Sequence, residues 1–193
     1  MSMDTDSGTL VVLVDEHDRV IGKAEKLRAH SDGGKLHRAV SVFIFNAKGE
    51  TLLQRRADGK YHSAGLWSNT CCTHPAPDEE PEVAARRRLK EEMGFDTPLR
   101  EGFEFIYRTA VGNGLTEWEY DHVFFGEYNG AVKPNPVEVS DYKWVSLDDL
   151  LADVKSKPQN YTRWLIILLN DHLQEIKNAL NNVTRHTSKT TIS

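Results

Sequence analysis

One long stripe of apolar residues towards the end of the chain constrains its fold more than any other feature. From Tyr161 to Leu180, apolar side chains recur at helical spacing. The members of this stripe are Trp164, Leu165, Leu168, Leu169, His172, Leu173, Ile176 and Leu180. The spacing predicts one amphipathic helix over residues 161–180 whose apolar face packs on a sheet.

Several segments supply strands for that sheet. Residues 9–14 (TLVVLV) and 39–46 (AVSVFIFN) are rich in β-branched residues, and the second segment meets TLLQRR through a turn, which predicts a hairpin. Aromatic, alternating stretches predict further strands at 103–108, 118–128 and 142–145. A short amphipathic segment, SLDDLLADV, follows the last of these and predicts a short helix.

A further helix is predicted from Pro81 to Met93, with Gly94 just past its end. Because we find no internal repeat or linker, these elements together indicate an α/β (α+β) sandwich, in which helices flank a mixed sheet. We expect one domain over residues 9–181, between a flexible N-terminus (1–8) and a flexible C-terminal tail (182–193).

Composition excludes several classes of function. The 193 residues include 39% hydrophobic residues, enough for one core, and their formal net charge is −5. An acidic chain has no general basic field for nucleic acid or an anionic membrane, so any anion must bind locally. No apolar run is long enough to span a bilayer, and the start lacks the features of a signal peptide. We expect a cytoplasmic protein that is a monomer or a weak homodimer.

The densest group of reactive side chains is Trp67-Ser-Asn-Thr-Cys-Cys-Thr-His74-Pro, shortly before the predicted helix 81–93. It contains both cysteines, Cys71 and Cys72, which are neighbours and cannot close a useful disulfide loop. A thiol close to a helix start and to an imidazole can be acidified and made reactive. An isolated cysteine is more often a small buried apolar residue, but the polar surroundings here favour a reactive thiol.

Residues suited to a divalent metal occur on both sides of this motif. His30 and His37 precede it, while Glu117 and Glu119 follow it at a spacing that puts both carboxylates on one face of a strand. With His74 they could fill five positions around a cation and leave the sixth open, a donor set that suits Mn, Zn or Fe better than Mg. A single histidine is more often a surface or core-edge residue, and spacing alone does not exclude others as ligands, such as His62, His122, His172 and His186.

Charged residues of the helix 81–93 allow two interpretations. Arg88 and Glu92 are one helical turn apart, and such a pair is usually a solvated ion pair. In the functional interpretation, Glu92 holds a hard cation on a phosphate while arginines face its oxygens. Arg55-Arg56 and Lys60 could add anion contacts, although a basic cluster on a loop is more often a solvated face.

The spacing in this helix is that of a Nudix box, in which the matching residues are Glu79, Arg87, Glu91, Glu92 and Gly94. Thr73 replaces the first glycine of the box, and Arg88 replaces the glutamate after its arginine. With the Cys-x-His and Glu-x-Glu motifs, the chain resembles the type 1 isopentenyl-diphosphate isomerases, a Nudix-fold family. The resemblance covers roughly residues 10–170 and implies interconversion of isopentenyl and dimethylallyl diphosphate through a tertiary carbocation.

The resemblance also implies roles for individual residues. Cys72 and Glu119 would be the catalytic pair, assisted by the Tyr107 hydroxyl. The metal site for Mn²⁺ or Zn²⁺ would comprise His30, His37, His74, Glu117 and Glu119, while Glu92 would hold a Mg²⁺ ion on the substrate diphosphate. The diphosphate and the hydrocarbon would be bound by Lys26, Arg56, Lys60, Arg88 and Trp164. One departure is the run Tyr61-His-Ser-Ala-Gly-Leu-Trp67, where many family members have a Phe-Pro-Gly type of run.

The residue types fit that chemistry. Moving a double bond requires one proton added to the alkene and another removed two carbons away, and Cys72 and Glu119 supply two groups for this. We hypothesise that Glu119 protonates while Cys72, as thiolate, takes the proton, although the sequence leaves the reverse assignment open. The cationic intermediate must be kept dry, and a tryptophan face can stabilise it by a cation–π attraction of up to about 2 kcal/mol.

Two alternatives compete with the isomerase. A Nudix pyrophosphohydrolase would use box glutamates to hold metals and activate water, but Arg88 occupies a position where such enzymes usually keep a carboxylate. A binding module with a structural zinc would use His30, His37, His74 and the acids, but closed structural sites usually have four ligands and are often rich in thiolate.

Overall fold

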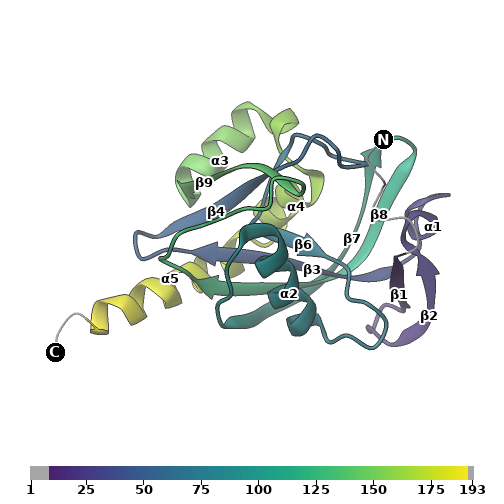
Figure 1. The fold of residues 1–193 in the computed structure, drawn as a ribbon, viewed down its shortest axis with the longest axis horizontal. Helices are drawn as coiled ribbons and strands as arrows, with labels where there is room; N and C mark the ends of the chain where they lie inside the picture. Colours follow the sequence, from purple (N-terminus) through teal and green to yellow (C-terminus); the bar gives the residue numbers. More distant parts are fainter. Residues whose placement is uncertain (1–8, 191–193) are drawn as a thin grey trace.

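The computed structural model describes the chain from residue 9 to residue 190, and its side chains as far as residue 183. Within this range nine strands form one mixed sheet with helices around it (Figure 1). The strands are β1 (Leu10–Val14), β2 (Val20–Glu25), β3 (His37–Phe45), β4 (Glu50–Arg56), β5 (Trp67–Ser68), β6 (Cys71–Thr73), β7 (Leu99–Gly112), β8 (Leu115–Glu127) and β9 (Val139–Ser146). The helices are α1 (Lys26–His30), α2 (Pro81–Met93), α3 (Leu147–Ser156), the 3-10 turn η1 (Pro158–Asn160), α4 (Arg163–Asp171) and α5 (Leu173–Thr190).

Strand β3 organises the sheet because four other strands pair with it. It runs parallel to β8 along its whole length, from His37 beside Glu119 to Phe45 beside Glu127. β7 and β8 form a long antiparallel hairpin. The predicted hairpin of β3 and β4 is present, but its strands pair only at Phe45 and Thr51, after which β4 pairs with β9. The gap that opens between β3 and β4 is occupied by β6 and β5, and the Cys-x-His motif begins in β6 at Cys72 and ends just after it at His74.

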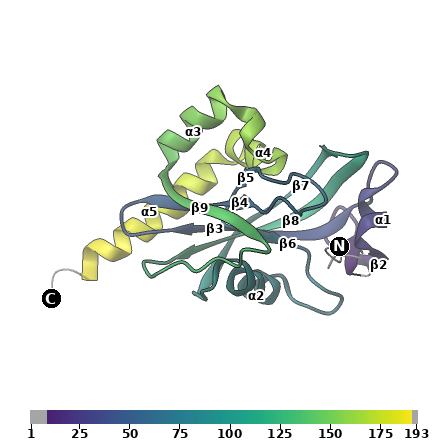
Figure 2. The ribbon, with the colours of Figure 1, turned by 45° about the horizontal axis from the view of Figure 1, so that its top comes forward.

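Helices cover both faces of this sheet (Figure 2). Successive residues of a strand point to opposite faces, so Phe43 and Phe45 pack in one cluster with α3, α4 and α5. Val42 and Ile44 pack in a second cluster on the other face, with Leu89 and other residues of α2. The predicted α/β/α sandwich with a mixed sheet is therefore confirmed.

Helix α2 has the predicted bounds. Pro81 stands in its first turn, and its apolar line, which is fully buried, comprises Ala85, Leu89 and Met93. Gly94 ends the helix in the left-handed conformation, with φ of 77°. A Cβ atom there would lie 2.2 Å from the carbonyl oxygen of Lys133, so the close approach of that loop requires glycine.

The single helix predicted over 161–180 is wrong, because the segment forms two helices. α4 ends at Asp171, and His172 takes non-helical angles, φ −127° and ψ 23°. The His172 ring lies 4.7 Å from the Phe103 ring and 4.6 Å from that of Phe105 on β7. This contact depends on where β7 lies in the fold. The spacing of apolar residues within 161–180 contains no information about the position of β7.

The sequence predicts flexible segments at both ends of the chain, residues 1–8 and 182–193. Residues 182–190 continue α5 as helix, while residues 1–8 and 191–193 lie outside the described range. Among residues 9–190, no helix combines the length and the apolar character that crossing a membrane requires.

Candidate active site

A cavity of about 600 Å³ collects most of the predicted site residues. Those that line it are Lys26, Arg56, Lys60, Cys72, His74, Arg88, Glu92, Tyr107, Glu117, Glu119 and Trp164. They come from β4 and the loop that follows it, from β6 and the residue after it, from the β7–β8 hairpin, and from α1, α2 and α4. The fold thus brings together positions up to 138 residues apart. The two remaining predicted residues, His30 and His37, are fully buried next to Glu119.

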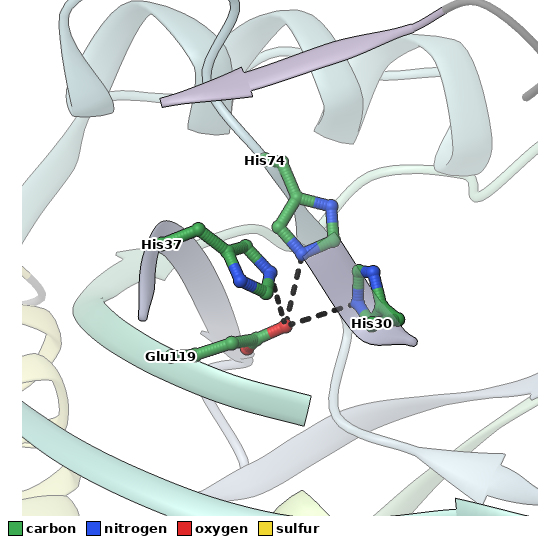
Figure 3. Close-up of side chains that lie close together, drawn as sticks. All are labelled: His30, His37, His74 and Glu119. Atoms are coloured by element: carbon green, nitrogen blue, oxygen red, sulfur yellow. Dashed lines mark hydrogen bonds and ion pairs between the residues drawn. The ribbon is translucent and has the colours of Figure 1, made fainter. Parts of the chain in front are cut away.

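Three imidazoles converge on one carboxylate oxygen (Figure 3). The Nε2 atoms of His74, His37 and His30 lie 2.9, 3.5 and 4.0 Å from Glu119 Oε1. One potential ligand atom from each of the four residues lies within 4.8 Å of the others. The parallel register that puts His37 beside Glu119 explains this, because residues paired across neighbouring strands share a face.

The backbone fixes the orientation of two of these imidazoles. His30 Nδ1 donates to Lys26 O and His37 Nδ1 donates to Lys35 O, both at 2.7 Å. Because a carbonyl oxygen only accepts, each Nδ1 must carry the hydrogen, which leaves the Nε2 lone pair directed at the cluster. Both Nε2 atoms are buried and have no hydrogen-bond partner among the residues that the structure describes. Two unpartnered lone pairs beside a carboxylate fit a divalent cation.

The electrostatics of the cluster favour neutral histidines beside a charged Glu119. Burial lowers the pKa of His30, with a further contribution from His37, and burial lowers the pKa of His74 to about 3. Burial opposes ionisation of Glu119, but His37 and His74 hold its pKa well below the usual range. Metal ligation requires these same protonation states, neutral imidazoles and an ionised carboxylate.

Glu117 and Glu119 share one tyrosine. The Tyr107 hydroxyl lies 2.6 Å from Glu119 Oε2 and 3.0 Å from Glu117 Oε2, and all three side chains are buried. The predicted placement of both carboxylates on one face of a strand is therefore confirmed. Burial and the neighbouring Glu119 raise the pKa of Glu117 well above the usual range. Since one O–H donates fully to only one acceptor, a protonated Glu117 completes this arrangement when no cation is bound.

Glu117 also belongs to a second group of possible ligands. His30, His62 and Glu117 offer one ligand atom each within 4.8 Å of one another, and all three are buried. His62 lies on the loop between β4 and β5, with its Nε2 3.6 Å from Glu117 Oε1. The sequence offers no spacing signal for His62, because a loop position has no fixed relation to strand residues far along the chain.

Cys72 lies in β6 and lines the cavity, while Cys71 is buried in the core. The Cys72 Sγ donates to Asn69 Oδ1 at 3.3 Å and lies 3.7 Å from the Ser41 hydroxyl, which donates to Asp121 at 2.7 Å. Burial, with a smaller contribution from Asp121, raises the pKa of the Cys72 thiol. This direction is opposite to the acidification that the sequence suggests, because Cys72 is buried in a strand, nine residues before α2 begins at Pro81.

Trp164 is buried in α4, and its indole is fixed by hydrogen bonds to the segment that carries Cys72. Nε1 donates to Ser68 Oγ at 3.0 Å and to Asn69 Oδ1 at 3.2 Å. The guanidinium of Arg56 lies 5.3 Å from the ring centroid, within cation–π range. Asn69 therefore bonds both Cys72 and Trp164, a role that no pattern in the sequence predicts.

Two of the predicted cationic residues, Arg88 and Lys60, form ion pairs with acids on α2 and just before β9. Arg88 Nη2 lies 2.7 Å from Glu92 Oε1 and 2.6 Å from Glu138 Oε2, and the Lys60 ammonium contacts the same Glu138 oxygen. Gln54 donates to the other Glu92 oxygen at 2.6 Å. Burial opposes ionisation of Glu138, but Lys60 and Arg88 lower its pKa overall. After His62 and Asn69, Glu138 is a third residue that only the fold identifies.

Solved structures of other proteins share this fold. A crystal structure of a protein from Deinococcus radiodurans is similar with a TM-score of 0.64 and 21% identity, over 76% of this chain and 89% of that chain. A NUDIX hydrolase from Nitrosomonas europaea is similar with a TM-score of 0.54 and 19% identity, over 72% and 90% of the two chains. The NUDIX domain family model matches residues 35–165. Fold and sequence thus define a NUDIX-domain protein.

Relatives of higher identity narrow the class. Isopentenyl-diphosphate Delta-isomerase 2 of Aromatoleum aromaticum is 56% identical over 155 residues, which cover 80% of this chain and 82% of that protein. Isopentenyl-diphosphate Delta-isomerase 2 of Photorhabdus laumondii is 54% identical over 155 residues, or 80% and 87% of the two chains. The chain belongs to the isopentenyl-diphosphate Delta-isomerase family.

Proposed function

We propose that this protein interconverts isopentenyl diphosphate and dimethylallyl diphosphate, the reaction implied by its family, through proton transfers within the cavity described above. The observation that carries the proposal is that one cavity is lined by a thiol, a tyrosine-bonded carboxylate and an indole. Two proton-transfer groups and an aromatic face are what a carbocation reaction at an unactivated alkene requires.

In the proposed mechanism, Glu119 and Cys72 act on the two ends of the allylic system. One group delivers a proton to the terminal alkene carbon, which leaves a tertiary cation, and the other removes a proton two carbons away so that the new double bond forms. The Tyr107 hydroxyl, 2.6 Å from Glu119 Oε2, orients that carboxyl group and supports its change of protonation. In the forward direction, the group that carries a proton when substrate is bound delivers it to the alkene, and the deprotonated group accepts the proton that leaves.

Trp164 has the proposed role of stabilising the cation without reacting with it. Its Nε1 hydrogen is engaged by Ser68 and Asn69, which fixes the plane of the ring. A fixed ring face gives an electrostatic attraction to a cation and offers no lone pair that would trap it. The same buried ring excludes water from its side of the cavity.

We propose that His30, His37, His74, Glu117 and Glu119 hold one divalent cation, Mn²⁺ or Zn²⁺. The directed Nε2 lone pairs of His30 and His37 and the charged Glu119 support this assignment. A bound cation would act as a Lewis acid that makes a carboxyl group on it more acidic. The protein itself supplies the neutral imidazoles and the backbone carbonyls that orient them.

The diphosphate is assigned to the cationic part of the cavity lining, formed by Lys26, Arg56, Lys60 and Arg88. Arginine forks and lysine ammonium groups suit the several oxygens of a diphosphate. Glu92 is proposed to hold Mg²⁺ on that diphosphate, since hard cations prefer carboxylate and phosphate oxygens. Anchoring the charged end in this way holds the hydrocarbon between Cys72 and Glu119.

The test is to incubate the purified protein with isopentenyl diphosphate, Mg²⁺ and Mn²⁺, and to follow dimethylallyl diphosphate and phosphate together. Allylic product from the wild type and almost none from Cys72→Ala would support the assignment. Cys71→Ala is the matched control, because this neighbouring thiol is buried in the core and should leave turnover largely intact. Phosphate release without allylic product would instead assign the site to a hydrolase.

A further inference from the structure

His62 is a buried histidine that the roles proposed above do not use. It lies in the run Tyr61-His-Ser-Ala-Gly-Leu-Trp67, where the chain departs from the Phe-Pro-Gly pattern of many family members. Only 5% of its surface is exposed, and the residue lines the cavity. Its ring packs edge-on against Tyr61 at 4.4 Å and Trp164 at 5.9 Å, which fixes its orientation.

The contacts of His62 direct one nitrogen towards the metal ligands. Nδ1 lies 3.2 Å from the hydroxyl of Ser63, while Nε2 faces Glu117 Oε1 at 3.6 Å. With His30 and Glu117 it forms a group whose ligand atoms lie within 4.8 Å of one another. The Nε2 atom of His30 is buried and has no hydrogen-bond partner within the described part of the chain. Donor atoms around a single first-row cation lie about 3 Å apart when they are adjacent, so small side-chain shifts bring this group into range.

The two groups of possible ligands share His30 and are connected through Glu117 and Glu119, which bind the same tyrosine. Five residues leave one position open around a six-coordinate cation, and His62 reaches the Glu117 side of that cluster. We propose that His62 Nε2 is an additional ligand of the metal centre and fills this sixth position. The inference rests on the proposed metal site of this protein, and it adds a fourth nitrogen donor to that site.

A fourth imidazole has a consequence for metal choice. Nitrogen donors favour Mn²⁺, Fe²⁺, Co²⁺ and Zn²⁺ over Mg²⁺, whose ligands are mostly oxygen atoms. His62 therefore increases the selectivity of the centre for transition metals over Mg²⁺. Filling the sixth position also leaves no site for a metal-bound water in a cavity that must exclude nucleophiles.

The alternative is that His62 only donates a hydrogen bond to Glu117 and lies outside the coordination sphere. Loss of either a ligand or such an outer partner lowers metal affinity, by about 10–100-fold for the outer partner. Metal affinity alone therefore does not distinguish a ligand from an outer hydrogen-bond partner. The visible absorption of bound Co²⁺ does, because it responds directly to the number and type of ligands. Gln in place of His62 can still donate a hydrogen bond but is a poor ligand for these metals.

The experiment compares the wild type with His62→Ala, His62→Gln, His74→Ala and His172→Gln after metal removal and refilling. Metal affinity is measured by competition with a chromophoric chelator for Mn²⁺, Zn²⁺ and Mg²⁺, and the visible spectrum is recorded with Co²⁺. We expect both His62 variants to lose at least about tenfold in Mn²⁺ and Zn²⁺ affinity. We also expect both to change the Co²⁺ spectrum and to leave Mg²⁺ affinity unchanged. Circular dichroism of the metal-free proteins checks that each variant is folded.

The two controls separate the possible failures. His172 lies outside the cavity lining, so its substitution should change neither affinity nor spectrum. If His74→Ala weakens binding while both His62 variants keep the wild-type Co²⁺ spectrum, His62 is not a ligand and the inference is overturned. If His74→Ala binds metal as tightly as the wild type, the proposed metal centre itself is wrong.

Discussion

The indole of Trp164 donates a hydrogen bond to the side-chain oxygen of Asn69, 3.2 Å away, and the same oxygen accepts from the Cys72 thiol at 3.3 Å. Asn69 is itself fully buried, and its amide nitrogen donates to the backbone carbonyls of Val42 and Cys71. One amide therefore fixes the proposed thiol and the proposed cation-stabilising ring relative to β3.

Asn69→Ala should lower turnover by about tenfold or more and also lower the melting temperature, since each buried polar group left unpaired costs about 1–3 kcal/mol. Ser68→Ala is the matched control, because it removes an acceptor of the indole but leaves the Cys72 contact. We expect iodoacetamide to react with Cys72 at an altered rate in the Asn69 variant and at the wild-type rate in the Ser68 variant. Equal rates in both would contradict the role given to Asn69.

Arg88→Ala should raise KM for the diphosphate and destabilise the fold by about 3 kcal/mol, because the buried Glu92 loses its cationic partner. Arg86→Ala offers a control on the same helix, since the ion pair of Arg86 with Asp96 is exposed and contributes little to stability. Steady-state kinetics and urea unfolding check both effects. Similar changes in the two variants would show that loss of any arginine from α2, and not the position of Arg88, is responsible.

Removing metal should abolish isomerisation and lower the melting temperature, because the His30 and His37 lone pairs would again be buried beside Glu119 without a partner. Dialysis against a strong chelator followed by Mn²⁺ or Zn²⁺ should restore both properties. In His74→Ala, chelation should cause a much smaller drop in melting temperature. An equal drop would place the stabilising ion elsewhere in the protein.

Gly94→Ala should destabilise the protein more than Gly112→Ala does. Both glycines have positive φ, 77° and 90°, which costs a non-glycine residue about 1–2 kcal/mol. Of the two, Gly94 is where the added Cβ atom would clash, at 2.2 Å from Lys133 O, whereas no atom of the described residues lies within 4 Å of a Cβ atom at Gly112. The free energy of unfolding in urea measures the difference. Equal losses would mean that the loop at Lys133 moves away at little cost.

Much of the fold follows from local pattern. The apolar spacing of α2, its proline start and its glycine end give the helix its bounds, because these depend on residues close together in sequence. The break at His172 does not follow, since that ring contacts Phe103 and Phe105 of β7. The limited pairing of β3 with β4 has a similar origin, because β5 and β6 enter between the two strands.

The sequence by itself determined the types of chemical group in the site and most of their positions: the Cys-x-His and Glu-x-Glu motifs, the two upstream histidines and the box arginine. Motifs of this kind are local, so a single chain records them. Only the tertiary structure decided that His62, Asn69 and Glu138 join them. Their relations to Glu117, Trp164 and Arg88 arise from the parallel pairing of β3 with β8 and from the packing of α2 and α4 on opposite faces of the sheet. Contacts across so many residues depend on how the whole core packs, and no spacing along the chain encodes them.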